Sequence, residues 1–131
     1  MPPRSSVPGS ARNWLDRAQG KLAMARQPLP PQGFLEDACF FLQQAAELAI
    51  KAVYQQHGWS FPYIHDLGQL LDGLENQGMT IPPAVREAEK LSSYAVETRY
   101  PGLGPPVTET EYQEALQIAE AVLAWAEALT P

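Results

Sequence analysis

The chain has 131 residues, 45% of them hydrophobic and 18% charged, which is enough for a single globular domain whose core needs no disulfide. Nine basic and fifteen acidic residues give a net charge of −6, which argues against broad binding to nucleic-acid backbones. The sequence has one cysteine, no apolar run long enough to span a membrane and no secretory signal pattern, so we expect a cytoplasmic protein.

The first predicted helix runs from about Ala11 to Gln27 and follows residues 1–9, a proline- and serine-rich segment that we expect to be a flexible tail. Ser10 is a favoured N-cap residue, and the prolines that begin at Pro28 end the helix. We expect its basic residues to form an outer face; they are Arg12, Arg17, Lys21 and Arg26.

The second predicted helix, from Phe34 to His57, is apolar on most sides, which is typical of a buried central helix. It is followed by Gly58, a residue type favoured at helix C-termini. One polar stripe remains on it, formed by Asp37, Gln44, Glu47 and Lys51. Glu47 and Lys51 have the favourable order for an ion pair one turn apart. The stripe is either a surface ion pair or the lining of a groove or interface.

A short third helix is predicted from Asp66, a favoured N-cap residue, to about Asn76. A fourth, longer helix begins at residues 81–83 and ends near residues 97–99, because Pro101 disfavours helix at the residue before it. The apolar side of this fourth helix consists of Val85, Ala88, Leu91, Tyr94 and Ala95.

The last predicted helix begins at a capping box formed by Thr108 and Glu111 and continues to Leu129. Its five glutamates and its lack of basic residues indicate a solvated face. No segment alternates like a strand, and there is no internal repeat. The sequence therefore predicts an all-α protein, an antiparallel helical bundle of four longer helices plus one short helix, with residues 10–131 as a single domain.

Three polar features outside the stripe are candidates for a functional site. His65, next to Asp66, either precedes a helix cap or transfers protons near a cleft. Arg99, next to Tyr100, is either a cation at a helix C-terminus or a partner for a phosphate and a base. Tyr94 is either a core tyrosine with a wet hydroxyl or part of the same helix end. No metal site, no cofactor and no glycine-rich phosphate loop is expected.

Several short motifs are informative in combination. They are Trp14-Leu15, the run from Cys39 to Glu47 with Lys51, His65-Asp66-Leu67, and Thr98-Arg99-Tyr100-Pro101. Together they resemble the HEPN domain family (higher eukaryotes and prokaryotes nucleotide-binding), and the likeness extends from Ala11 to Leu129. The resemblance implies an all-α bundle that pairs as a homodimer in the cytoplasm, usually of a prokaryote. It also implies a neighbouring minimal nucleotidyltransferase, in a toxin–antitoxin or modification pair.

Some members of the family bind nucleotides, and others are metal-independent ribonucleases with an Arg-x4–6-His motif. In this sequence no histidine follows Arg99, so the ribonuclease motif is incomplete and we expect a binding protein rather than an enzyme. In this interpretation Lys51 and Arg99 meet phosphate and Tyr100 stacks on a base. The predicted ligand-binding residues are Gln44, Glu47, Lys51, His65, Asp66, Tyr94, Arg99 and Tyr100. Two alternatives remain: a ribonuclease toxin that uses Arg99 with His65, and a purely structural dimer with no ligand.

Overall fold

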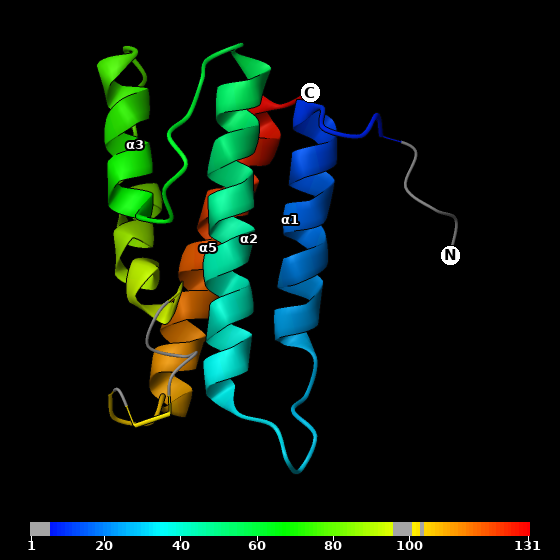
Figure 1. The fold of residues 1–131 in the computed structure, drawn as a ribbon, viewed down its shortest axis with the longest axis vertical. Helices are drawn as coiled ribbons and strands as arrows, with labels where there is room; N and C mark the ends of the chain where they lie inside the picture. The colour runs from blue at the N-terminus through cyan, green and yellow to red at the C-terminus, as the bar shows by residue number, and fades with distance from the viewer. Residues whose placement is uncertain (1–5, 96–100, 103) are drawn as a thin grey trace.

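The computed structural model describes residues 6–95, 101–102 and 104–131. These residues contain six helical segments joined by loops, and no strand occurs among them. In chain order they are α1 (Ala11–Arg26), α2 (Leu35–Gln56), α3 (Leu67–Asn76), α4 (Pro83–Arg86), the 3₁₀-helix η1 (Glu87–Ala95) and α5 (Glu109–Leu129). Figure 1 shows α1, α2 and α5 as long neighbouring helices, with α3 on the side of α2 away from α1. The predicted all-α fold is confirmed.

The helix α2 is the centre of the bundle, because it contacts α1, α3, α5 and η1. Its buried apolar positions lie on several sides of the helix; they are Ala38, Cys39, Leu42, Ala45, Ala46, Ala49, Ile50, Ala52, Val53 and Tyr54. Many of them are alanines, whose small side chains let neighbouring helices approach closely. Gly58 follows the helix with φ of +69°, the left-handed conformation that glycine adopts without strain.

Local capping explains where three of the helices begin. The side chain of Ser10 accepts a hydrogen bond from the backbone of Asn13 at the start of α1. The Asp66 carboxylate accepts one from Gln69 at the start of α3. Thr108 and Glu111 form the predicted capping box at the start of α5.

The segment before α1 falls only partly within the described residues. Residues 1–5 of the expected flexible tail lie outside the described residues. Within residues 6–10, the backbone N–H of Gly9 donates to Asn13, and Asn13 donates to Ser6. No helix within the described ranges is long and apolar enough to cross a membrane.

The predicted fourth helix differs from the expectation, because only α4 is α-helical and the following η1 is a 3₁₀-helix. The spacing of the buried residues fits a 3₁₀-helix. Val85, Ala88 and Leu91 are each buried and are spaced by three. A 3₁₀-helix has three residues per turn, so this spacing keeps one apolar row against the core. The predicted end of the fourth helix, residues 97–99, lies outside the described part of the chain.

The contact between α1 and α5 uses some of the charges that were expected on the surface. Arg12 donates two hydrogen bonds to the Glu127 carboxylate, at 2.8 and 2.9 Å, and Gln19 donates a third at 3.0 Å. The hydrogen bond from Arg12 lowers the pKa of Glu127. Arg26 donates a single hydrogen bond to Glu120, in a more exposed ion pair. These two arginines therefore join α1 to α5 while their side chains stay partly exposed, and two of the five glutamates of α5 have a cationic partner.

Candidate functional site

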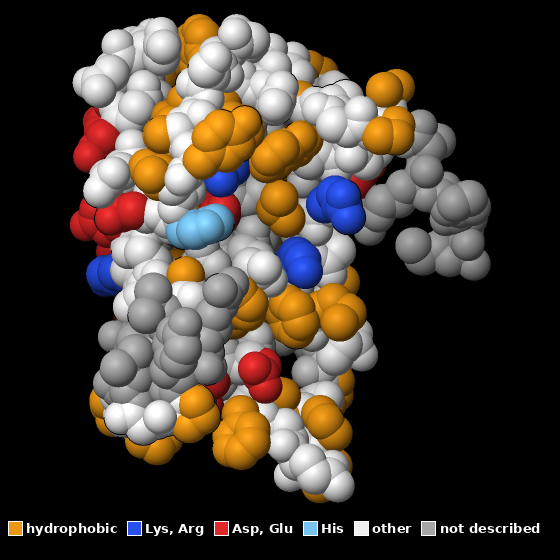
Figure 2. All heavy atoms as spheres, viewed as in Figure 1, with side chains coloured by type: hydrophobic (Ala, Val, Ile, Leu, Met, Phe, Trp, Pro, Cys, Tyr) orange, Lys and Arg blue, Asp and Glu red, His pale blue; other side chains and the backbone are white. Residues whose placement is uncertain are grey.

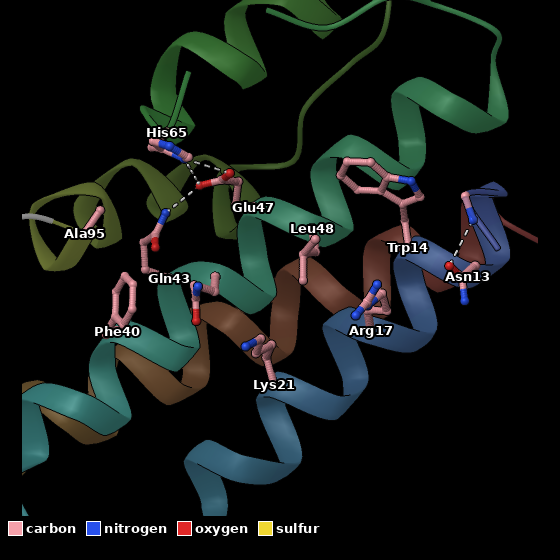
Figure 3. A pocket seen from close by; sticks show the side chains of 12 residues that line it. Asn13, Trp14, Arg17, Lys21, Phe40, Gln43, Glu47, Leu48, His65 and Ala95 are labelled. Atoms are coloured by element: carbon pink, nitrogen blue, oxygen red, sulfur yellow. Dashed lines mark hydrogen bonds and ion pairs between the residues drawn. The ribbon is translucent and has the colours of Figure 1, made fainter. Parts of the chain in front are cut away.

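A pocket of about 560 Å³ lies between α1, α2 and the segment that leads into α3 (Figure 3). Small-molecule sites typically have volumes of about 300–1,000 Å³, so the pocket is large enough for an organic ligand. Figure 2 shows basic side chains (blue) and histidine (pale blue) on this face of the molecule, with apolar side chains (orange) beside them. The lining residues are Gly9, Asn13, Trp14, Arg17, Lys21, Phe40, Gln43, Gln44, Glu47, Leu48, His65 and Ala95.

The α2 wall of the pocket is organised around the Glu47 carboxylate. Gln43 Nε2 donates to Glu47 Oε1 at 2.8 Å, and Lys51 Nζ donates to Glu47 Oε2 at 2.9 Å. The Glu47 and Lys51 side chains are only 12% and 8% exposed, so this ion pair is nearly buried. Because the three residues are spaced by four, they occupy one face of the helix. The negative charge of Glu47 is therefore balanced from within the wall.

His65 reaches the same carboxylate from the segment before α3. Its Nδ1 lies 3.0 Å from Oε1 and 2.9 Å from Oε2 of Glu47. A carboxylate only accepts hydrogen bonds, so Nδ1 carries the proton in this contact. In the neutral ring Nε2 is then the acceptor, and the His65 side chain is 76% exposed. Within the described residues Nε2 has no hydrogen-bond partner, so the arrangement holds at the pocket an imidazole that can accept a hydrogen bond from a ligand.

The α1 wall carries Trp14, Arg17 and Lys21, which share one helix face because they are spaced by three and four. Figure 3 shows Arg17 and Lys21 extending from α1 on the opposite wall from Glu47 and His65. Within the described part of the chain neither cation has an ion-pair partner, and the Lys21 ammonium lies 5.3 Å from the centroid of the Phe41 ring. Two positive charges that pair with no carboxylate in the described residues make this wall attractive to an anion.

Arg17 and Lys21 are the site residues that sequence reasoning missed, because it assigned them to an outer basic face. Their spacing from Trp14 was the available signal. An aromatic residue that shares a helix face with two cations indicates a face that is not wholly solvated. Trp14 and Lys21 are half-buried, and Arg17 is exposed.

Three of the predicted site residues line the pocket: Gln44, Glu47 and His65. Lys51 lies deeper. It is 6% exposed, bonded to Glu47, and its ammonium lies 5.1 Å from the centroid of the Phe61 ring. Lys51 is not among the lining residues, and its charge neutralises Glu47 instead of facing the pocket.

The remaining predicted residues are not brought to the pocket by the described structure. Asp66 caps α3, the first of its two predicted roles. Tyr94 is partly buried beside Cys39, and burial raises the pKa of both Tyr94 and the Cys39 thiol to about 12. A thiol with so high a pKa is unreactive near neutral pH. Arg99 and Tyr100 lie outside the described residues.

The fold and the site define an all-helical protein with a polar pocket against its central helix. The sequence model of the HEPN domain matches residues 11–129, so the chain belongs to the HEPN family. No curated protein matches the chain.

Two solved structures are similar to this chain over nearly its whole length. One is the crystal structure of TT1696 from Thermus thermophilus, with 34% identity and a TM-score of 0.79, covering 91% of this chain and 97% of that one. The other is the crystal structure of ST0689, described as an archaeal HEPN homologue, with 28% identity and a TM-score of 0.72, covering 93% of this chain and 98% of that one. The similarity to ST0689 supports the assignment to the family.

Proposed function

We propose that this HEPN protein binds a nucleotide in the pocket between α1 and α2. The observation that carries the proposal is the pair of cations, Arg17 and Lys21, on the wall of a pocket of suitable volume. A guanidinium donates in a fixed fork that matches phosphate oxygens, and an ammonium adds a mobile point charge. Trp14 lines the same wall, and its indole offers a flat surface to a base.

The opposite wall supports the same ligand. A bare carboxylate in the pocket would repel a phosphate, but Lys51 balances the charge of Glu47 from behind. Gln44 adds an amide that donates and accepts, and His65 adds the acceptor Nε2. The polar parts of a nucleotide therefore have partners on both sides of the pocket.

The wider role that we propose is that of an accessory protein, acting in the cytoplasm as a homodimer beside a nucleotidyltransferase in a prokaryotic toxin–antitoxin-like pair. Membership of the HEPN family supports it, together with the similarity to proteins from Thermus thermophilus and from an archaeon. Light scattering of the purified protein measures the dimer directly. A measured mass of 14.4 kDa, that of a single chain, would contradict the dimer.

The test of the binding proposal is calorimetric titration of the full chain with ATP, GTP and their mono- and diphosphates. We expect binding to at least one of them, and a loss of about tenfold or more in Arg17→Ala and in Lys21→Ala, since charge-assisted hydrogen bonds contribute about 1.5–3 kcal/mol each. Lys90→Ala is the matched control, because Lys90 is exposed on η1 and pairs with Glu87. The proposal fails if no nucleotide binds, or if the control weakens binding as much as Lys21→Ala does. In that case the structural dimer is favoured.

One observation favours the ribonuclease alternative, namely the contact that holds the His65 imidazole on Glu47. A carboxylate that orients an imidazole is a common arrangement for proton transfer. In this alternative His65→Ala and Arg99→Ala each abolish RNA cleavage by the pure protein. Cleavage that survives both substitutions contradicts the assignment, and its absence in the unmodified protein leaves binding as the function.

A further inference from the structure

A row of three aromatic rings leads from the pocket to the surface. Trp14 lines the pocket and meets Phe61 edge-on, with ring centroids 5.3 Å apart. Phe61 meets Tyr63 in the same manner at 6.2 Å. We call Trp14, Phe61 and Tyr63 the aromatic row. It connects the pocket with a ring that lies outside it.

The middle ring of the aromatic row is firmly held, and the last ring is open to solvent. Phe61 is also in edge contact with Tyr54 at 5.9 Å, and the Lys51 ammonium lies 5.1 Å from its centroid. Tyr63, by contrast, is 97% exposed, the highest exposure of the large hydrophobic residues within the described ranges. A single exposed aromatic residue is common on protein surfaces. An exposed ring that continues a row from a cationic pocket offers a surface for stacking.

The cations and the row follow one another along the protein. Lys21, Arg17 and Trp14 succeed each other along α1, at about 1.5 Å of rise per residue (Figure 3 labels all three). Trp14 contacts Phe61, and Phe61 contacts Tyr63. Two positive groups are thus followed by a ring, a spacer ring and an exposed ring. A molecule with a terminal phosphate followed by two bases has the same order of groups.

We propose that Tyr63 is a second ring-binding subsite and that the ligand is a 5′-phosphorylated dinucleotide unit. The inference rests on the proposed nucleotide binding. The terminal phosphate lies on Arg17 and Lys21, the first base beside Trp14 and the second base on Tyr63. Bases stack on aromatic side chains without strong sequence preference, so Tyr63 accepts any base. The net charge of −6 favours a short ligand over a long strand, whose many phosphates would meet a negative surface.

The test is calorimetric titration of the full chain with AMP, with the 5′-phosphorylated dinucleotide pApA, and with 5′-phosphorylated octa-adenylate. We expect pApA to bind about tenfold more tightly than AMP, which is within the contribution of one stacked base. Tyr63→Ala removes this advantage and leaves the affinity for AMP unchanged. Because the Tyr63 side chain is almost fully exposed, its removal leaves the core intact.

The matched control is Phe34→Ala, which removes another exposed ring, 65% exposed, at the opposite end of α2 from the row. We expect it to change neither affinity. If octa-adenylate binds no more tightly than pApA, the ligand is a free dinucleotide. If octa-adenylate binds more tightly and this gain depends on Tyr63, the ligand is a single strand that carries the same dinucleotide unit. The inference is overturned if AMP binds but pApA gains nothing, or if Tyr63→Ala weakens AMP and pApA equally. The proposed function is overturned instead if AMP and all the other nucleotides of the first titration fail to bind.

Discussion

The helix α1 carries four basic residues that meet two different environments. Arg12 and Arg26 pair with glutamates of α5, at what we call the α1–α5 seam. Arg17 and Lys21 line the pocket and have no ion-pair partner within the described residues. The same residue types on one helix thus serve two purposes. A cation that already has a carboxylate stabilises the fold, whereas an unpaired cation in a concave site remains available to a ligand.

The buried pair behind the pocket is where we expect the largest effect on stability. Lys51→Ala leaves the Glu47 carboxylate without its cation in a nearly buried position, which costs about 3–5 kcal/mol in unfolding free energy. Urea denaturation measures this loss. The control is the double variant Glu47→Leu with Lys51→Met, which removes both charges and is expected to recover most of the stability. A Lys51→Ala variant as stable as the unmodified protein would show that the pair is solvated.

The α1–α5 seam is expected to have a smaller effect. Arg12→Ala removes a two-bonded ion pair whose side chains are 37% and 35% exposed, so solvent screens it. We expect a loss of about 0.5–1 kcal/mol in unfolding free energy and no change in nucleotide affinity. Arg17→Ala is the matched control from the same helix. If Arg12→Ala weakens nucleotide binding as strongly as Arg17→Ala does, the two groups of cations are not separate.

The seam also has a pH dependence whose direction follows from Glu127. Arg12 lowers the pKa of this carboxyl below its ordinary value of 4.5, so its contribution is complete above that value and is lost as the pH falls through the lowered pKa. Between pH 7 and pH 3 the unmodified protein should lose slightly more stability than Glu127→Gln, by less than about 1 kcal/mol. Urea midpoints at the two pH values measure the difference. An equal loss in both proteins would contradict the role of Glu127.

The smallest effect on stability is expected at the pocket itself. The double variant Arg17→Ala with Lys21→Ala removes two cations that pair with no carboxylate in the described structure, so unfolding free energy should change by no more than about 0.5 kcal/mol. The same variant should lose the rise in melting temperature that a bound nucleotide produces. A large loss of stability without any ligand would show that the two cations support the fold.

The candidate site was only half predictable from the sequence. Gln44, Glu47 and His65 were predicted as one group, and all three line one pocket. Gln44 and Glu47 stand out in the sequence because they are polar residues on an apolar helix. Arg17 and Lys21 were not predicted as site residues, because a charged residue on an amphipathic helix looks the same whether it faces water or a pocket. Lys51 was placed on the ligand side, while burial beneath Phe61 directs it to Glu47.

The sequence by itself determined the all-α fold, the central position of α2 and the caps at Asp66 and Thr108, because helix periodicity and capping depend on residues within a few positions of each other. The sequence also contained the spacing by three of the apolar residues Val85, Ala88 and Leu91, the last two of which lie in η1. Only the tertiary structure decided which cations of α1 are paired. Arg12 and Glu127 are 115 positions apart, and no local pattern relates residues so distant. The packing of α5 against α1 engages two cations and leaves two others on the pocket wall.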